Sequence, residues 1–164
     1  MTTTLAKKHA LLARIRAGLR DDLAMLARSH AATAEGVTHP DARAEGDKDM
    51  RSTEASYVAR GQARRVATLE EELSALDGLV LRERAEHEPA ALGALVTVEL
   101  TSGTLTYFIL PAAAGAEATA SDEVVRVVTP RSPLGRALIG RRAGDVVSWS
   151  APQGEVEGLV RSVR

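Results

Sequence analysis

Residues 41–57 read DARAEGDKDMRSTEASY, a strongly charged stretch that separates two segments with helical periodicity. The stretch carries the carboxylates of Asp47, Asp49 and Glu54, and a glycine and a proline just before it favour a bend in the chain. A bend between two helical segments reverses the direction of the chain. We therefore expect the tip of a helical hairpin at about residues 36–54, with acidic side chains at its far end.

The segments on both sides of this tip have narrow apolar seams. Before it, leucines recur every seven residues with other apolar residues between them: Leu5, Leu12, Ile15, Leu19, Leu23 and Leu26. After it, a helical pattern from near Met50 or Ser52 to about Arg84 has the seam Val66, Leu69, Leu73, Leu76 and Val80, which Tyr57 and Val58 continue towards the tip. Neither seam can bury itself, so we expect an antiparallel α-helical coiled-coil hairpin over residues 1–85, roughly 45 Å long.

The second half of the chain has the pattern of an antiparallel β-sheet. Strands are expected at residues 94–101, 104–110, 122–129, 145–150 and 155–163, and residues 111–121 are expected to form a loop. Ser132 and Pro133 open a short helix that ends at Gly140, with serine as the N-cap and proline at the first helical position. The predicted fold class is α+β, with the helical hairpin followed by a sheet domain with one short helix at residues 86–164.

The totals exclude several classes of protein. The 164 residues include no cysteine, which excludes disulfides, thiolate metal sites and cysteine nucleophiles. The formal net charge is −1, so no overall positive field attracts nucleic acid. No apolar run reaches membrane-spanning length, and residues 1–10 contain no signal-peptide core. We expect a cytoplasmic protein with no membrane association and no small-molecule substrate.

Two stretches resemble the bacterial GreA/GreB transcript-cleavage factors. Residues 132–160, SPLGRALIGRRAGDVVSWSAPQGEVEGLV, are similar to the C-terminal signature of that family: Ser-Pro, a small helix, Leu-Ile-Gly, Gly-Asp-Val-Val and a Pro-x-Gly-Glu-Val-Glu turn. Residues 42–73 resemble the family's tip and returning helix, with Gly46-Asp47 and Ala55-Ser56-Tyr57 as the matching residues. The resemblance implies an FKBP-like C-terminal domain behind the coiled coil.

The resemblance also implies a partner, which is bacterial RNA polymerase. The segment with Ser132, Pro133, Leu134 and Leu138 matches the part of the family that contacts the rim of the polymerase secondary channel. The same serine and proline are also explained as the N-cap and the first residue of a short helix. Contact with the polymerase and this structural role can hold together. In the family the residue before the serine is often an acid or an amide, whereas here it is Arg131.

At the tip, the resemblance implies that Asp47, Asp49 and Glu54 act inside the polymerase. Asp47 and Asp49 would help to hold a catalytic Mg²⁺ jointly with the polymerase, near the nascent RNA 3′ end and the DNA template, and so stimulate cleavage of backtracked RNA. The chain itself would be no enzyme and would have no cofactor of its own. The plain alternative is a solvated charged loop in which Asp47 or Ser52 caps the second helix.

The spacing of the tip acids departs from the family, whose Asp and Glu lie three residues apart. The equivalent pairs here are Asp47 with Met50 and Asp49 with Ser52, and neither pair supplies two acids. A second function therefore stays open: a Gre-like secondary-channel regulator that inhibits transcription or competes with cleavage factors. A generic coiled-coil adaptor, unrelated to polymerase, is a third and weaker alternative.

Two further expectations concern the second helix of the hairpin and the sheet. Arg60, Arg64 and Arg65 form a basic patch that, by the resemblance, would face the displaced RNA 3′ end. An ordinary solvated helix face, balanced by the acids at residues 70–72, is the favoured alternative. FKBP-like folds can be prolyl isomerases, but aromatic residues make up only 2% of this chain, so we expect no isomerase pocket.

Overall fold

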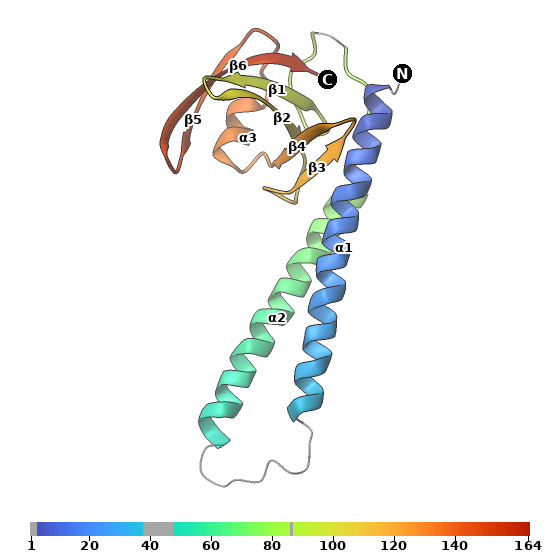
Figure 1. Cartoon of the computed structure of the whole chain (residues 1–164), viewed down its shortest axis with the longest axis vertical. Coiled ribbons are helices and arrows are strands. Elements are labelled where there is room, and N and C mark those ends of the chain that lie inside the picture. Colours follow the sequence, from blue (N-terminus) through green and yellow to red (C-terminus); the bar gives the residue numbers. More distant parts are fainter. Residues whose placement is uncertain (1–2, 38–47, 86) are drawn as a thin grey trace.

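The structure, a computed structural model, describes residues 3–37, 48–85 and 87–164. Two long helices, α1 (Thr4–Val37) and α2 (Lys48–Asp77), run side by side away from a six-stranded sheet that carries one short helix, α3 (Pro133–Leu138) (Figure 1). The strands are β1 (Leu95–Leu100), β2 (Gly103–Ile109), β3 (Glu117–Ala120), β4 (Glu123–Val128), β5 (Val146–Ala151) and β6 (Gly154–Val163). The predicted α+β class is confirmed. No helix within these described ranges is long and apolar enough to cross a membrane.

Among the side chains that the structure describes, the fully buried residues of the predicted seams lie in the half of the helix pair nearest the sheet. Leu12, Ile15 and Leu19 of α1 are buried with Leu69 and Leu76 of α2 in one cluster. Leu11, which the seam omits, is also fully buried. At that level α1 packs against both α2 and β3, so a wider stripe of the helix is covered than a two-helix seam provides. Supercoiling of the pair stays a prediction.

The expected end of the second helix, near Arg84, is wrong. The helix ends at Asp77, and the backbone N–H of Gly78 donates to the Ser74 carbonyl at 3.1 Å. The chain then leaves the helical path, which buries Leu81 and leaves Val80 86% exposed. Val80 is therefore not part of the seam. Tyr57 and Val58, expected to extend the seam, are also exposed, because they lie beyond the part of α2 that packs on the cluster.

The sheet has one more strand than the five expected. The strand order is β3-β4-β2-β1-β6-β5, and all neighbours are antiparallel except β2 and β4, which are parallel. The additional strand, β3, lies inside the expected loop at residues 111–121. Its sequence, EATA, lacks large apolar residues, but its alanines alternate towards the core. Ser121 and Asp122, both with positive φ, form the tight turn into β4.

The sheet edge formed by β3 and β4 is tied to the helices. Lys7 of α1 forms an ion pair with Glu123 of β4, and the Arg14 guanidinium donates to the Thr119 carbonyl of β3. These contacts join the beginning of α1 to the sheet. The opposite ends of the helices, at Val37 and Lys48, therefore lie far from the sheet (Figure 1).

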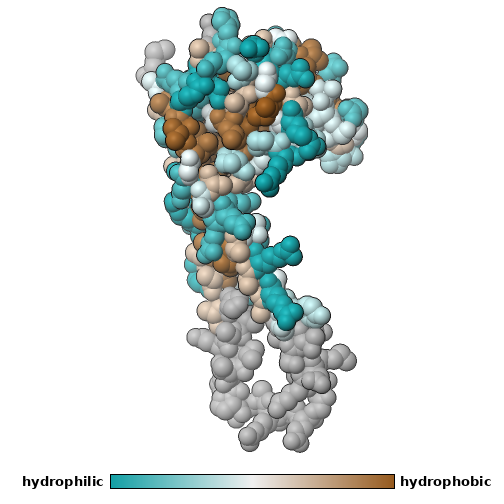
Figure 2. Space-filling view, turned by 180° about the vertical axis from the view of Figure 1, so that it is seen from behind, coloured by the Kyte–Doolittle hydropathy of each residue, from teal (hydrophilic) through white to brown (hydrophobic). Residues whose placement is uncertain are grey.

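The surface differs between the two parts of the molecule. On the face in Figure 2, patches of strongly hydrophobic side chains lie among hydrophilic ones over the upper part of the molecule, which holds the sheet, and long hydrophilic side chains project from the helix pair. Exposed apolar area is the usual mark of a surface that binds another molecule. The part of the molecule formed by the sheet and α3 is therefore the candidate for a binding surface.

Candidate functional site: an apolar hollow beside helix α3

The segment that opens α3 is held by its own hydrogen bonds. The Ser132 hydroxyl donates to the Thr129 carbonyl at 2.8 Å and accepts the backbone N–H of Gly135 at 3.0 Å, which makes it the N-cap. Pro133 occupies the first turn, where its missing N–H costs nothing. The predicted helix-start chemistry is confirmed. Because both bonding directions of the hydroxyl are used inside the segment, Ser132 shapes the surface and is not a free donor.

Gly135 shows how tightly this segment is folded. A Cβ added at this residue would collide with the Thr129 carbonyl, which means that only glycine fits without a backbone shift. Residues 129–135 therefore form a tight loop, and Pro133 and Leu134 lie on its outer side.

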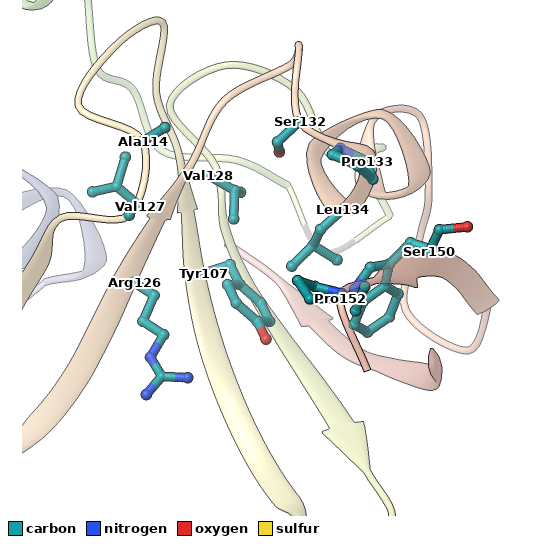
Figure 3. A pocket seen from close by; sticks show the side chains of 13 residues that line it. Tyr107, Ala114, Arg126, Val127, Val128, Ser132, Pro133, Leu134, Ser150 and Pro152 are labelled. Carbon is teal, nitrogen blue, oxygen red and sulfur yellow. The ribbon is translucent and has the colours of Figure 1, made fainter. Parts of the chain in front are cut away.

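An apolar hollow of about 490 Å³ lies between this loop, the sheet and the end of β5. Its lining includes Tyr107 of β2, Ser132, Pro133 and Leu134 of the α3 segment, and Trp149 of β5 with Pro152 just after it. In Figure 3 Leu134 and Pro152 lie close together, and the Tyr107 ring lies between them and Arg126. A concave apolar surface with a few polar groups at its margin is typical of a binding site.

Two of the chain's aromatic side chains meet in this hollow, although the composition suggested that no aromatic pocket would form. In the sheet, β1 and β6 separate β2 from β5, so Tyr107 and Trp149 line one hollow only because the sheet curves. Burial raises the pKa of the Tyr107 phenol above its ordinary value. The expectation that the sheet has too few aromatic residues to line a pocket is therefore wrong at this hollow. The expected absence of isomerase activity stays a prediction.

The predicted polymerase-binding residues fall into two groups. Ser132, Pro133 and Leu134 line the hollow. Leu138, in contrast, is fully buried in the cluster that includes Val96 and Val147. Its side chain supports α3 from inside and has no exposed surface to offer a partner, so its predicted role as a contact residue is not compatible with its position.

The predicted tip lies at the other end of the molecule. Asp47 is outside the described residues. Asp49 and Glu54 belong to the first two turns of α2, at the end farthest from the sheet, and their side chains are outside the described part. Among the residues that the structure describes, no group of three or more His, Asp or Glu side chains could hold a metal ion. Magnesium binding by Asp47 and Asp49 stays a prediction.

The predicted basic patch lies along α2. Arg60, Arg64 and Arg65 are all exposed, and Arg60 and Arg64 are one helical turn apart on one face. No ion pair joins these three side chains to another residue in the described parts of the chain. Their position fits a solvated helix face as well as an RNA-facing patch.

Sequence reasoning missed several residues of the hollow. Tyr107, Trp149 and Pro152 carry no local signal, because they come together only through the curvature of the sheet. Arg126 also lines the hollow; its guanidinium pairs with Glu117 at 2.7 Å, and both side chains are about half exposed. One signal was available: residues 124–144 contain five arginines and no acidic residue.

Comparison with known proteins gives one family. Residues 86–164 match the family model described as "Transcription elongation factor, GreA/GreB, C-term", a range that contains the whole sheet, α3 and the hollow. No curated protein matches the chain.

Several solved structures are similar over most of the chain. GreA factor homolog 1 (Gfh1) of Thermus thermophilus is 23% identical, with 91% of this chain and 94% of that chain covered and a TM-score of 0.38. Thermus aquaticus Gfh1 is 21% identical, covers 89% and 91%, and has a TM-score of 0.37. The elongation factor GreA/GreB from Nitrosomonas europaea is 14% identical, covers 70% and 94%, and has a TM-score of 0.35.

Proposed function

We propose that this chain, which belongs to the GreA/GreB family of transcription elongation factors through its C-terminal region (residues 86–164), binds RNA polymerase at the secondary channel and stimulates cleavage of backtracked RNA. The single observation that carries the proposal is the family match over the region that holds the hollow. The hollow would dock on the polymerase, and the far ends of α1 and α2 would enter the channel.

The shape of the molecule supports this division of tasks. The 34 residues of α1 extend over about 51 Å at about 1.5 Å per residue. Among the described side chains, the buried members of the main cluster lie in the half of the helix pair nearest the sheet. Among the described residues, the outer half of the helix pair contributes little to the hydrophobic core. The length of the helices is therefore better explained by a need to reach a distant partner site than by a contribution to stability.

The docking surface would be the hollow together with the loop that opens α3. Pro133 is exposed and Leu134 is half-buried, so both can contact a partner without unfolding. The N-cap bonds of Ser132 hold this loop in place before binding, which reduces the entropy lost on docking. In this proposal Ser132 acts on the polymerase through the loop that it holds.

At the tip, carboxylates would add ligands to a Mg²⁺ that the polymerase holds. Mg²⁺ binds oxygen ligands and keeps water and phosphate in its shell, so one or two carboxylates from another molecule suffice. Positions 49 and 54 are about 140° apart around a helix of 3.6 residues per turn. Asp49 and Glu54 alone would therefore not face one ion together, and the proposal assigns the metal to Asp47 and Asp49, with Glu54 as a secondary group. Factors of this family are not enzymes themselves, and the polymerase performs the cleavage.

The test is RNA cleavage in stalled, backtracked elongation complexes with the polymerase of the organism that encodes this chain. We expect the wild-type chain to accelerate cleavage and Asp47→Ala/Asp49→Ala to lose the acceleration while it still binds. Asp21→Ala/Asp22→Ala, which removes two exposed acids from the middle of α1, is the matched control and should keep the acceleration.

Two other outcomes would change the assignment. Tight binding with slowed or unchanged cleavage would indicate the regulator that competes with cleavage factors. Absence of binding to the polymerase would overturn the proposed function and leave only family membership.

A further inference from the structure

Positive charge is concentrated around the hollow, although the whole chain has a formal net charge of −1. Residues 124–144 run from β4 through α3 to the beginning of β5 and contain Arg126, Arg131, Arg136, Arg141 and Arg142 without any acidic residue. Glu123 and Asp145 flank this run and Glu117 pairs with Arg126, so the excess of positive charge lies with the arginines that have no carboxylate partner.

Two of these arginines stand directly beside the docking loop. Arg131 precedes Ser132, and the Arg136 guanidinium donates to the Arg131 carbonyl at 2.9 Å, which places it against the same loop. Both side chains are exposed, and within the described ranges neither forms an ion pair. Their charges are therefore available to a partner.

The other three arginines make their contacts outside this loop. Arg126 is paired with Glu117. The Arg141 and Arg142 side chains donate to the carbonyls of Ala137, at the other end of α3, and His87. Arg131, next to Ser132 of the lining, and Arg136, bonded to the Arg131 carbonyl, thus belong to the loop that lines the hollow, and within the described residues neither has a carboxylate partner.

We propose that the hollow receives an acidic segment of the polymerase, with an aliphatic or aromatic side chain of that segment in the hollow and its carboxylates paired with Arg131 and Arg136. This inference rests on the proposed function and names the chemistry of the partner surface. Guanidinium groups bind carboxylates through two parallel hydrogen bonds, and apolar contact beside them excludes water from the pair.

The apolar hollow is what favours a protein segment over nucleic acid. A phosphate backbone would use the arginines, but it would leave Leu134, Trp149 and Pro152 without an apolar partner.

The experiment measures the affinity of the full chain for core RNA polymerase without nucleic acid, at about 50 mM and at about 300 mM salt. We expect Arg131→Glu/Arg136→Glu to weaken binding at least tenfold at low salt and by a smaller factor at high salt, because screening weakens exposed charge pairs. Arg131→Lys/Arg136→Lys should keep most of the affinity. The matched control, Arg141→Glu/Arg142→Glu, makes the same change in charge away from the loop and should lose much less.

The outcomes separate this inference from the proposed function. If the wild-type chain does not bind the polymerase, the proposed function fails. If it binds and the Arg131/Arg136 reversal changes nothing, or if the control loses as much, only the acidic partner segment is overturned. Weaker binding by the reversal variant that occurs only with complexes containing DNA and RNA would mean that the arginines contact nucleic acid, which also overturns the inference.

Discussion

Ser132 and Gly135 depend on each other: the hydroxyl of Ser132 caps the backbone N–H of Gly135 at 3.0 Å, and the missing side chain of Gly135 lets the loop close on Thr129. This relationship fixes the loop that presents Pro133 and Leu134 beside the hollow. The docking surface therefore depends on backbone geometry as much as on exposed side chains.

Gly135→Ala should destabilise the fold by roughly 1–3 kcal/mol, because its Cβ would collide with the Thr129 carbonyl and force the backbone to move. Urea denaturation would measure the change. The control is Gly18→Ala in α1, where nothing lies within 4 Å of the added Cβ; alanine is the better helix former, so a gain of roughly 0.5–1 kcal/mol is expected there. Equal stability of Gly135→Ala and wild type would contradict the close approach.

Removal of the N-cap should act on stability and on docking together. Ser132→Ala loses the acceptor for the Gly135 N–H and should cost about 1 kcal/mol of stability. Polymerase binding should weaken as well, because the loop is no longer held. Ser132→Thr keeps a hydroxyl that can accept from the Gly135 N–H and donate to the Thr129 carbonyl, and should recover most of the stability. If Ser132→Ala binds normally, the ordering of this loop is not needed for docking.

Filling the hollow should block docking without unfolding the protein. Ala114 is exposed and lines the hollow, so Ala114→Trp would place a large ring where the partner side chain is expected. We expect an unchanged melting temperature and a polymerase affinity reduced at least tenfold. Ala143→Trp, an exposed alanine that does not line the hollow, is the control and should bind normally. Tight binding by Ala114→Trp would show that the hollow stays empty in the complex.

Because of Lys8, the stability of the folded protein should rise with pH in the alkaline range. Lys8 is fully buried near the beginning of α1, where its ammonium donates to the Arg82 carbonyl at 3.0 Å. Burial, and then the charges of Arg84 and Arg82, lower its pKa to about 8, against the weaker opposing effect of Glu83 and Glu88. Between pH 8 and the ordinary lysine value of 10.5 the unfolded chain binds more protons than the folded chain, so stability rises with pH.

The slope of this rise can be measured by urea denaturation between pH 7.5 and about 9.5, and the contribution of Lys8 should not exceed about 1.4 kcal/mol per pH unit. Lys8→Met removes the buried charge and should flatten the curve over that range. Lys48→Met, at the opposite end of the helix pair, is the control and should keep the wild-type slope. A slope that survives in Lys8→Met would assign the effect to another group.

Local signals in the sequence determined much of the fold. The leucines spaced by seven, the N-cap at Ser132-Pro133 and the alternation in the strands act through neighbours a few residues away, so α1, α3 and five of the six strands could be predicted. The resemblance to the GreA/GreB family lay in the same kind of contiguous stretch. Of the candidate docking residues, Ser132, Pro133 and Leu134 were found in this way.

Only the tertiary structure decided the rest, because the deciding contacts join residues far apart in the chain. The strand EATA forms since β4 and α1 cover it, and α2 ends at Asp77 so that Leu81 can enter the core. Leu138 is buried, and the curvature of the sheet brings Tyr107 and Trp149 to the lining of one hollow. The periodicity of the sequence cannot predict such long-range arrangements. Burial and curvature depend on how the whole sheet packs rather than on the residues beside each position.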